Sequence, residues 1–334
     1  MNPTATRIDV HHHMVPPDYV AVLTQHGITG TGGVDFPTWF PQQSLTLMDR
    51  QGIATAVLSL SAPGVFIGDV ALACDLARRC NDYAAQCVAS APHRFGAFAT
   101  LPLPDIGGAL REMEYALDVL RCDGIVLLTN YGGHYLGDPA FDEVFAELNR
   151  RKTVVFIHPT VSIGDAIPQG NDSGSPIPLP SATLEFPFDT TRAVAYLLAS
   201  GTLQRSPDVR FILPHAGGTV PYLAAKIATG AVWGKSGSRQ QLLEQIMRGL
   251  TQLQNLYYDT ALSANPFQLG PLQSFTSPTH ILFGSDYPWA NEAITAANVQ
   301  GIETFQQFDD QSRQRIRCEN ALSLFPRLMG QGSS

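Results

Sequence analysis

The amino-acid sequence predicts an α/β protein of the (β/α)8, or TIM-barrel, class. Three observations lead to this prediction. Eight short apolar runs recur along the chain, helical patterns lie between them, and a length of 334 residues suits one such barrel. Because strand–helix alternation repeated eight times builds a parallel sheet that closes on itself, we expect a single domain over residues 1–334.

The predicted strands are short runs of β-branched or apolar residues that are bounded by residues typical of turns. Several, such as TVVFIHP and HILFGSD, are apolar almost throughout. Strands of parallel sheets have this character because both of their faces are buried. The eight ranges are 7–13, 54–60, 94–103, 124–129, 153–159, 210–216, 256–261 and 280–288.

Helical patterns separate these strands. Residues 70–90 carry apolar side chains at spacings of three and four, and 188–200 and 238–253 are similar. Another helix is expected after Asp138, a good N-cap residue, with Pro139 at the first helical position. The alternative is an open doubly wound sheet, which usually carries a glycine-rich phosphate loop after its first strand. Here three histidines stand in that place.

Two predicted loops are unusually long, at 25–41 and 160–182. Both follow strands, so they are expected on the carboxyl-end face of the barrel, where barrel enzymes place their sites. Loops of this length in a compact domain are usually either functional or disordered, and the alternative here is a mobile insertion. We therefore expect them to cover a substrate or to contact another subunit.

Composition favours small-molecule chemistry. The formal net charge is −8, from 21 Lys and Arg against 29 Asp and Glu. A chain without a basic run has no electrostatic footprint for nucleic acid or anionic lipid, so neither partner is expected. The five cysteines are scattered with no C-x-x-C pair, and neither a leader-like nor a membrane-length apolar run stands out. A protein of the reducing cytoplasm is expected.

The first strand ends in Asp9-Val10-His11-His12-His13. Side chains alternate between the two faces of a strand, so His11 and His13 are expected to project together and His12 the opposite way. Two imidazoles at this spacing can chelate a metal ion at the mouth of a barrel.

Three further residues with the same chemistry end later strands. His158 ends VVFIHP, His215 ends FILPHAGG and Asp286 ends ILFGSDYP. Neutral imidazoles combined with a carboxylate are the donor set of zinc or a similar divalent ion. A catalytic site of this kind leaves one position open for water or substrate.

The motifs IDVHHH, FIHP, LPHAGG and FGSDYP, in this order, resemble those of the amidohydrolase superfamily. More narrowly, together with LEFPFDTTRA, they resemble its branch of metal-dependent, oxygen-independent decarboxylases, which includes the aminocarboxymuconate semialdehyde, 6-methylsalicylate and resorcylate enzymes. The resemblance extends from about residue 7 to 328. It implies that His11, His13, His158 and Asp286 bind the metal and that His215 acts beside it as an acid or base.

One divalent ion is expected. Two-metal hydrolases of the superfamily often use a lysine at the end of strand four, whereas that strand reads GIVLLTN here and Lys152 lies at the start of strand five. Histidine-rich ligation favours Zn²⁺, and Mn²⁺ is the alternative because related decarboxylases also use it. The resemblance also implies a homodimer or a homotetramer.

The implied reaction is release of CO2 from an aromatic or unsaturated carboxylate, such as 6-methylsalicylate or a related hydroxybenzoate. Asp286 and His215 are both candidates for protonating the carbon that loses CO2. A small carboxylate needs apolar walls, and the candidate wall residues are the aromatic side chains Phe40, Phe188, Tyr287 and Trp289.

Two other functions are compatible with the same residues. A hydrolase such as a lactonase would use a metal-bound water in place of the decarboxylation step. A non-catalytic binding protein on a barrel scaffold is the other, because a fold by itself does not establish catalysis.

Overall fold

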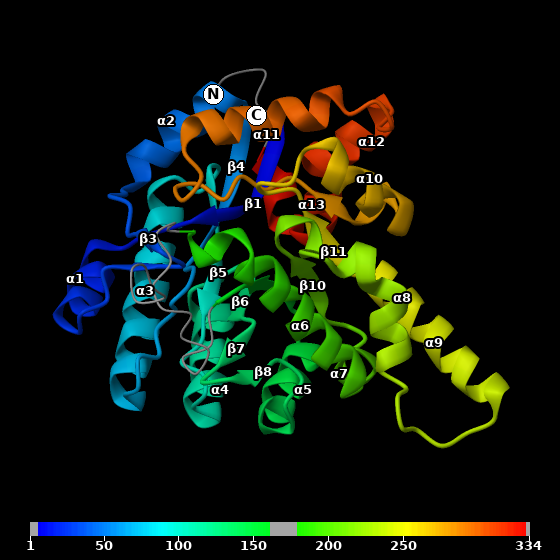
Figure 1. The fold of residues 1–334 in the computed structure, drawn as a ribbon. Coiled ribbons are helices and arrows are strands. Elements are labelled where there is room, and N and C mark those ends of the chain that lie inside the picture. The colour runs from blue at the N-terminus through cyan, green and yellow to red at the C-terminus, as the bar shows by residue number, and fades with distance from the viewer. Residues whose placement is uncertain (1–5, 161–178, 332–334) are drawn as a thin grey trace.

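The computed structural model describes residues 6–160 and 179–331, which form a barrel of parallel strands surrounded by helices (Figure 1). This confirms the predicted fold class. Of the predicted loop 160–182, residues 161–178 lie outside the described residues. The eight barrel strands are β1 (Arg7–His13), β4 (Ile53–Ser59), β5 (Phe95–Thr100), β6 (Gly124–Leu128), β9 (Val154–His158), β10 (Arg210–Leu213), β11 (Tyr257–Asp259) and β12 (Ile281–Leu282).

These strands follow one another around the sheet in chain order, and every neighbouring pair is parallel. Main-chain hydrogen bonds join the last strand segment to the first. The N–H of Val10 donates to the carbonyl of Phe283 at 3.0 Å, and the N–H of His13 donates to that of Tyr287 at 2.7 Å. This closure brings the carboxyl ends of all eight strands to one face of the barrel.

Several strands are shorter than predicted. The predicted range 210–216 becomes β10, which ends at Leu213, and 280–288 becomes β12, which ends at Leu282. The physical reason lies in the backbone just beyond these strands, because His215 and Asp286 have φ values of +54° and +63°. A left-handed residue interrupts the extended backbone of a strand, and beyond Asp286 the chain returns to the sheet only at Tyr287, which pairs with His12.

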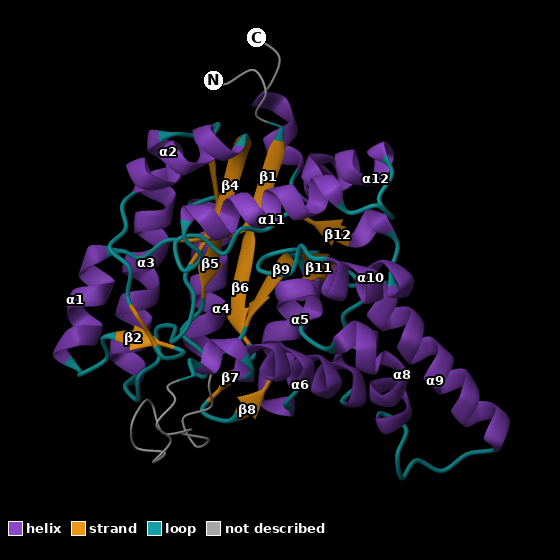
Figure 2. Cartoon of the chain, turned by 45° about the horizontal axis from the view of Figure 1, so that its top comes forward, coloured by secondary structure: helices purple, strands orange, loops and turns teal. Residues whose placement is uncertain are grey.

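Helices cover the outside of the sheet (Figure 2). Helix α3 spans the predicted range 70–90, and the predicted N-cap Asp138 accepts a main-chain hydrogen bond from the helical segment that follows it. Ser238 does the same at the start of the predicted helix 238–253. The helices are α1 (Pro17–Gln25), α2 (Pro41–Gln51), α3 (Val70–Ser90), α4 (Ile106–Glu114), α5 (Asp142–Arg150), α6 (Glu185–Ala199), α7 (Thr202–Arg205), α8 (Val220–Gly230), α9 (Arg239–Gln254), α10 (Pro266–Phe275), α11 (Glu292–Thr304), α12 (Asp310–Gln314) and α13 (Asn320–Leu324).

The interior of the barrel is a packed core. Strand side chains such as Val57, Phe98 and Phe156 fill it, and Phe325 from the segment after α13 packs edge-on against Phe98 at 5.7 Å between ring centroids. Aliphatic and aromatic side chains therefore close the amino-end side of the barrel. The polar residues at the other end of the strands pack directly above this apolar core.

Strand β1 contains an irregularity that decides which side chains face the interior. Its pairing with β4 shifts register between Asp9 and His12. Ile8 and Val10 belong to the interior core, and His11 and His13 also face the interior. A bulge of this kind changes the parity of the strand, so that interior positions move from even to odd residue numbers.

The predicted loop 25–41 contains a short hairpin of β2 (Gly30–Thr31) and β3 (Val34–Asp35). Elsewhere, α8 and α9 run side by side and reach away from the barrel (Figures 1 and 2). Within the described residues, no helix is both long and apolar enough to cross a membrane.

Candidate metal centre

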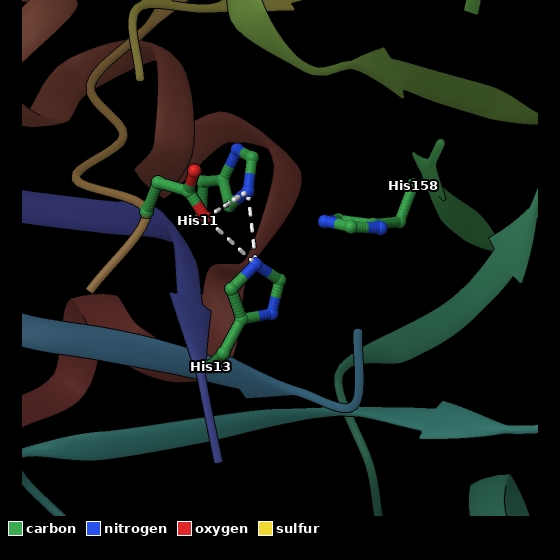
Figure 3. Close-up of side chains that lie close together, drawn as sticks. His11, His13 and His158 are labelled. Atoms are coloured by element: carbon green, nitrogen blue, oxygen red, sulfur yellow. Dashed lines mark hydrogen bonds and ion pairs between the residues drawn. The ribbon is translucent and has the colours of Figure 1, made fainter. Parts of the chain in front are cut away.

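Four buried side chains meet at the carboxyl end of the barrel. His11, His13, His158 and Asp286 each turn one donor atom to a common point, and these atoms all lie within 4.8 Å of one another. Figure 3 shows His11 and His13 side by side, with the ring of His158 pointing toward them from another strand. The donors come from β1, the end of β9 and the residues after β12.

The closest contacts in this cluster join the three ligand atoms of His11, His13 and Asp286. The Nε2 atoms of His11 and His13 are 3.0 Å apart, and the Oδ1 atom of Asp286 lies 3.2 Å and 3.1 Å from them. Two nitrogens bound at about 2.0–2.1 Å to a tetrahedral ion lie about 3.3 Å apart. The observed spacings are close to that value, so these three residues fit one shared cation.

Each histidine is held through its second ring nitrogen, which leaves Nε2 for the centre. The Nδ1 atom of His11 is 2.7 Å from Oδ2 of Asp259. The Nδ1 atom of His13 is 3.0 Å from Oγ of Ser59, and that of His158 is 2.8 Å from the carbonyl of Pro159. Such bonds determine which nitrogen of an imidazole is available to a metal.

The electrostatics also favour a cation. Burial lowers the pKa of His11, but the carboxylates of Asp259 and Asp286 outweigh it and raise that pKa to about 10. Burial keeps the pKa of His13 low, and burial together with the neighbouring imidazoles keeps that of His158 well below its usual value. Burial opposes ionisation of Asp286, yet His11 lowers its pKa well below the usual range. The carboxylates of Asp259 and Asp286 therefore favour a positive charge at the point where the four donor atoms meet.

His215 lies beside the cluster. Its Nε2 atom is 3.3 Å from Oδ2 of Asp286, the oxygen that faces away from His11 and His13. Its buried Nδ1 atom has no hydrogen-bond partner among the described residues. Among the described residues, its polar contact with the cluster is therefore the one to Asp286, while its ring packs against that of His11 at 5.0 Å between centroids. This position suits an acid or base rather than a fifth anchored ligand.

Two glycines after His215 allow its turn. Gly217 and Gly218 have φ values of +76° and +62°. A Cβ at Gly217 would lie 2.6 Å from the ring of Tyr258, and one at Gly218 would lie 2.2 Å from the carbonyl of Pro187. Both the left-handed backbone and the close packing therefore require glycine there.

A pocket of about 160 Å³ lies above these residues. His158, His215 and Asp286 form part of its lining, and most of the rest is apolar. Its volume is below the range of about 300–1,000 Å³ for drug-sized ligands, which suits a small substrate. The remaining lining residues are Thr31, Val34, Ser61, Ala182, Phe186, Leu262, Trp289, Ala290 and Ile294.

Of the four predicted wall residues, the structure places Trp289 in this pocket. Its indole N–H donates to Oγ of Ser61 at 3.0 Å. Phe40 and Tyr287 instead line a separate surface groove, where Tyr287 packs against His12 at 5.2 Å between ring centroids. Phe188 is 53% exposed on α6 and is absent from the described pocket lining.

Sequence reasoning missed Phe186, which lines the pocket and meets the ring of His158 edge-on at 6.1 Å. Helix α6 begins at Glu185, so Phe186 and Phe188 are about 200° apart around its axis. The motif EFPF contains both rings, but only the helical phase shows which one faces inward.

Asp259, at the end of β11, was also missed. It is fully buried and contacts both His11 and the main chain of His215. The signal that reveals His158 and Asp286, a polar residue ending an apolar strand, is present in LYYDT as well.

The chain is similar to known proteins over nearly its whole length. Residues 8–327 match the family model described as Amidohydrolase. The decarboxylase yanB of Aspergillus niger is 41% identical, over 96% of this chain and 88% of its own. The 6-methylsalicylic acid decarboxylase of Penicillium expansum is 37% identical over 97% of both chains.

Solved structures share the fold. An amidohydrolase II superposes with a TM-score of 0.85 at 29% identity, covering 96% of this chain and 99% of the other. The dihydroxybenzoic acid decarboxylase of Polaromonas sp. JS666, solved with manganese and the inhibitor 2-nitroresorcinol, gives 0.76 at 24% identity, covering 98% and 97%. The resemblance noted in the motifs is confirmed. The chain therefore belongs to the amidohydrolase family, as a carboxy-lyase of its decarboxylase branch.

Proposed function

We propose that this protein removes CO2 from an ortho-hydroxybenzoate such as 6-methylsalicylate, in a metal-dependent reaction that needs no oxygen. The observation that carries the proposal is a cation-favouring cluster of three histidines and one aspartate at the floor of a small apolar pocket. The substrate named for the Penicillium expansum relative supports the choice of acid.

In this proposal one divalent ion is held by His11, His13, His158 and Asp286. When bound, it supplies Lewis-acid chemistry and orients the carboxylate and hydroxyl oxygens of the substrate. The histidine-rich donor set favours Zn²⁺. The manganese in the Polaromonas enzyme supports Mn²⁺ as the alternative.

The pocket walls bind the arene and exclude water from it. Trp289 and Phe186 supply aromatic surface from opposite parts of the chain, and Leu262 adds an aliphatic side chain. Removing this surface from water favours binding of an apolar ring, at about 25 cal/mol per Å² buried. The carboxylate of such a ring is then directed to the polar floor.

His215 is the proposed proton donor. Direct loss of CO2 would leave a carbanion, whereas protonating the ring carbon first avoids that charge. The carbon–carboxylate bond then breaks, its electron pair restores the ring, and CO2 leaves. Oδ1 of Asp286 faces His11 and His13, where the ion would bind, and Oδ2 faces Nε2 of His215. A carboxylate in that role has no proton to give, so the imidazole is assigned the transfer.

A direct test is CO2 release from metal-assayed protein with a panel of ortho-hydroxybenzoates that includes 6-methylsalicylate. The proposal expects CO2 that disappears on chelation and returns when metal is restored. No CO2 from any member, with about one metal per chain, would overturn it. A lactone panel would then test the hydrolase alternative, in which water is added instead.

We also propose that the protein is a homodimer. Large apolar side chains are exposed on the α8–α9 arm and on α10, with Tyr222 at 83%, Trp233 at 87% and Phe267 at 89%. Exposed aromatic residues are enriched at interfaces between protein chains. Light scattering after size exclusion distinguishes a dimer from a tetramer, and Trp233→Glu is expected to shift either one toward monomer.

Two further proposals concern organisation and location. The described residues build one barrel, which supports a single domain over residues 1–334. All five cysteines are free thiols, which supports a reducing, cytoplasmic location. Limited proteolysis and fractionation of the expressing cells test these points.

A further inference from the structure

Asp259 is a buried charge with an unusual set of partners. Its side chain is inaccessible to solvent at the end of β11. One oxygen, Oδ2, lies 2.7 Å from Nδ1 of His11. The other, Oδ1, accepts the main-chain N–H groups of His215 at 2.9 Å and Ala261 at 3.0 Å. A buried carboxylate is tolerated only when its lone pairs are satisfied, and both oxygens here are.

The bond to His11 sets the chemistry of that ring. An imidazole that donates from Nδ1 presents the lone pair of Nε2 on its opposite side. Here Nε2 is the atom that faces His13 and Asp286. A carboxylate can only accept, so of the two neutral forms of the His11 ring Asp259 selects the one in which Nε2 carries no proton and is free to bind a metal.

The bonds to the main chain set the position of His215. This residue has a φ of +54°, a left-handed conformation that is costly for any residue other than glycine. The hydrogen bond from its N–H to Asp259 holds the chain at that strained point. The same carboxylate therefore supports the turn that carries the proposed proton donor.

A glycine on the neighbouring strand segment leaves room for this arrangement. A Cβ at Gly284 would lie 2.8 Å from Cβ of His11 and 3.2 Å from Cβ of Asp259. The fold thus brings β1, β11 and the end of β12 close enough for one carboxylate to reach both His11 and His215.

We propose that Asp259 is the positioning residue of this site: its carboxylate selects the metal-binding form of His11 and, through its second oxygen, holds His215 in register with that metal. The inference rests on the proposed metal centre and deepens it. It assigns Asp259 no contact with substrate.

The substitution Asp259→Asn separates the two roles. The introduced amide keeps one oxygen for the two main-chain donors, and its NH2 group then points at Nδ1 of His11. That ring must accept there and carry its proton on Nε2, where a metal would bind. We expect metal affinity to fall about 10- to 100-fold, the range found for partners of metal ligands. Activity should return at high metal concentration, because His215 remains in place.

Asp9→Asn is a matched control. Asp9 is equally buried, also accepts two main-chain N–H groups, from His11 at 3.1 Å and Ser285 at 3.0 Å, and also contacts an imidazole, that of His12 at 2.9 Å. His12 lies outside the metal cluster, and its Nε2 faces the hydroxyl of Ser44 at 2.8 Å, whose oxygen can accept a hydrogen bond from an Nε2–H group. We therefore expect Asp9→Asn to keep its metal affinity within about twofold.

The measurement is Zn²⁺ binding by competition with a chromogenic chelator, with circular dichroism as the check on folding. Wild-type affinity in Asp259→Asn, or an equal loss in Asp9→Asn, would overturn the inference. Failure of the wild-type protein to bind metal would instead refute the proposed centre. If Asp259→Asn does not fold, zinc-loaded wild-type protein still decides the matter, because its ¹H–¹⁵N spectrum must contain a protected Nδ1–H proton assigned to His11.

Discussion

Replacing His215 with alanine separates metal binding from proton transfer. The polar contact of the imidazole with the cluster is Nε2 to Oδ2 of Asp286 at 3.3 Å. This distance is slightly beyond the usual range for an N–H···O bond. The lost bond is worth at most about 1.5 kcal/mol, so metal affinity should fall by no more than about tenfold.

Turnover should respond far more strongly. A positioned general acid contributes about 10²- to 10⁴-fold, which corresponds to about 2.7–5.5 kcal/mol in the activation free energy. The fall should appear in kcat, while KM changes little, because the aromatic and aliphatic walls of the pocket are unaltered. These two expectations differ by at least tenfold at their nearest values, so one experiment can separate them.

The assay is CO2 release under saturating metal, paired with the metal content of the desalted protein. His134→Ala is the control, since this exposed imidazole pairs with Asp138 at the surface. The reasoning is refuted if His215→Ala loses its metal, which would make His215 a ligand. Turnover within tenfold of wild type would likewise remove it from proton transfer.

Three other perturbations test separate parts of the structure. His158→Ala removes one of four donors, so metal affinity should fall more than about 100-fold, measured by chelator competition; unchanged affinity would exclude it as a ligand. Leu262→Gly should change the unfolding free energy by less than about 1 kcal/mol, because relief of a φ of +54° offsets the flexibility of glycine. The same substitution should raise KM for the arene, because Leu262 lines the pocket. An unchanged KM would contradict this. Glu303→Gln should lower stability by about 1 kcal/mol at neutral pH. Burial alone would raise the pKa of Glu303, but the hydrogen bonds from Arg317 at 2.8 Å and Arg7 at 2.6 Å lower it below its usual value. The stabilisation is therefore full above about pH 4.3 and is lost as the pH falls through the folded pKa. Denaturant melts across pH check this, and a constant difference between the two proteins down to strong acid would contradict it.

The barrel and its four metal-facing residues are predictable because both depend on local pattern. Apolar runs such as TVVFIHP mark buried strands, and alternation with helices implies a parallel sheet. A parallel barrel brings the carboxyl ends of its strands together, so polar residues that end those runs must meet. His158 and Asp286 are found in this way without any knowledge of their neighbours.

The pocket walls are harder to predict. Phe186 and Phe188 belong to the same motif, and the point at which α6 begins decides which ring faces His158. Tyr287 directly follows Asp286, yet its ring packs against His12 and lines the surface groove rather than the pocket. A pattern of aromatic residues does not contain this information, because the phase of a helix and the direction of an irregular segment depend on distant contacts.

The sequence alone therefore determines the class of fold, the strands that form it and the chemical types gathered at one end of the barrel. The tertiary structure decides the direction in which each of those side chains points. The register shift in β1 sets which histidines face inward, and the left-handed turn at His215 places its ring beside Asp286. Asp259 reaches His11 across 248 positions of sequence. Local patterns encode burial, whereas the partner that satisfies a buried polar atom is chosen only when the whole chain has closed.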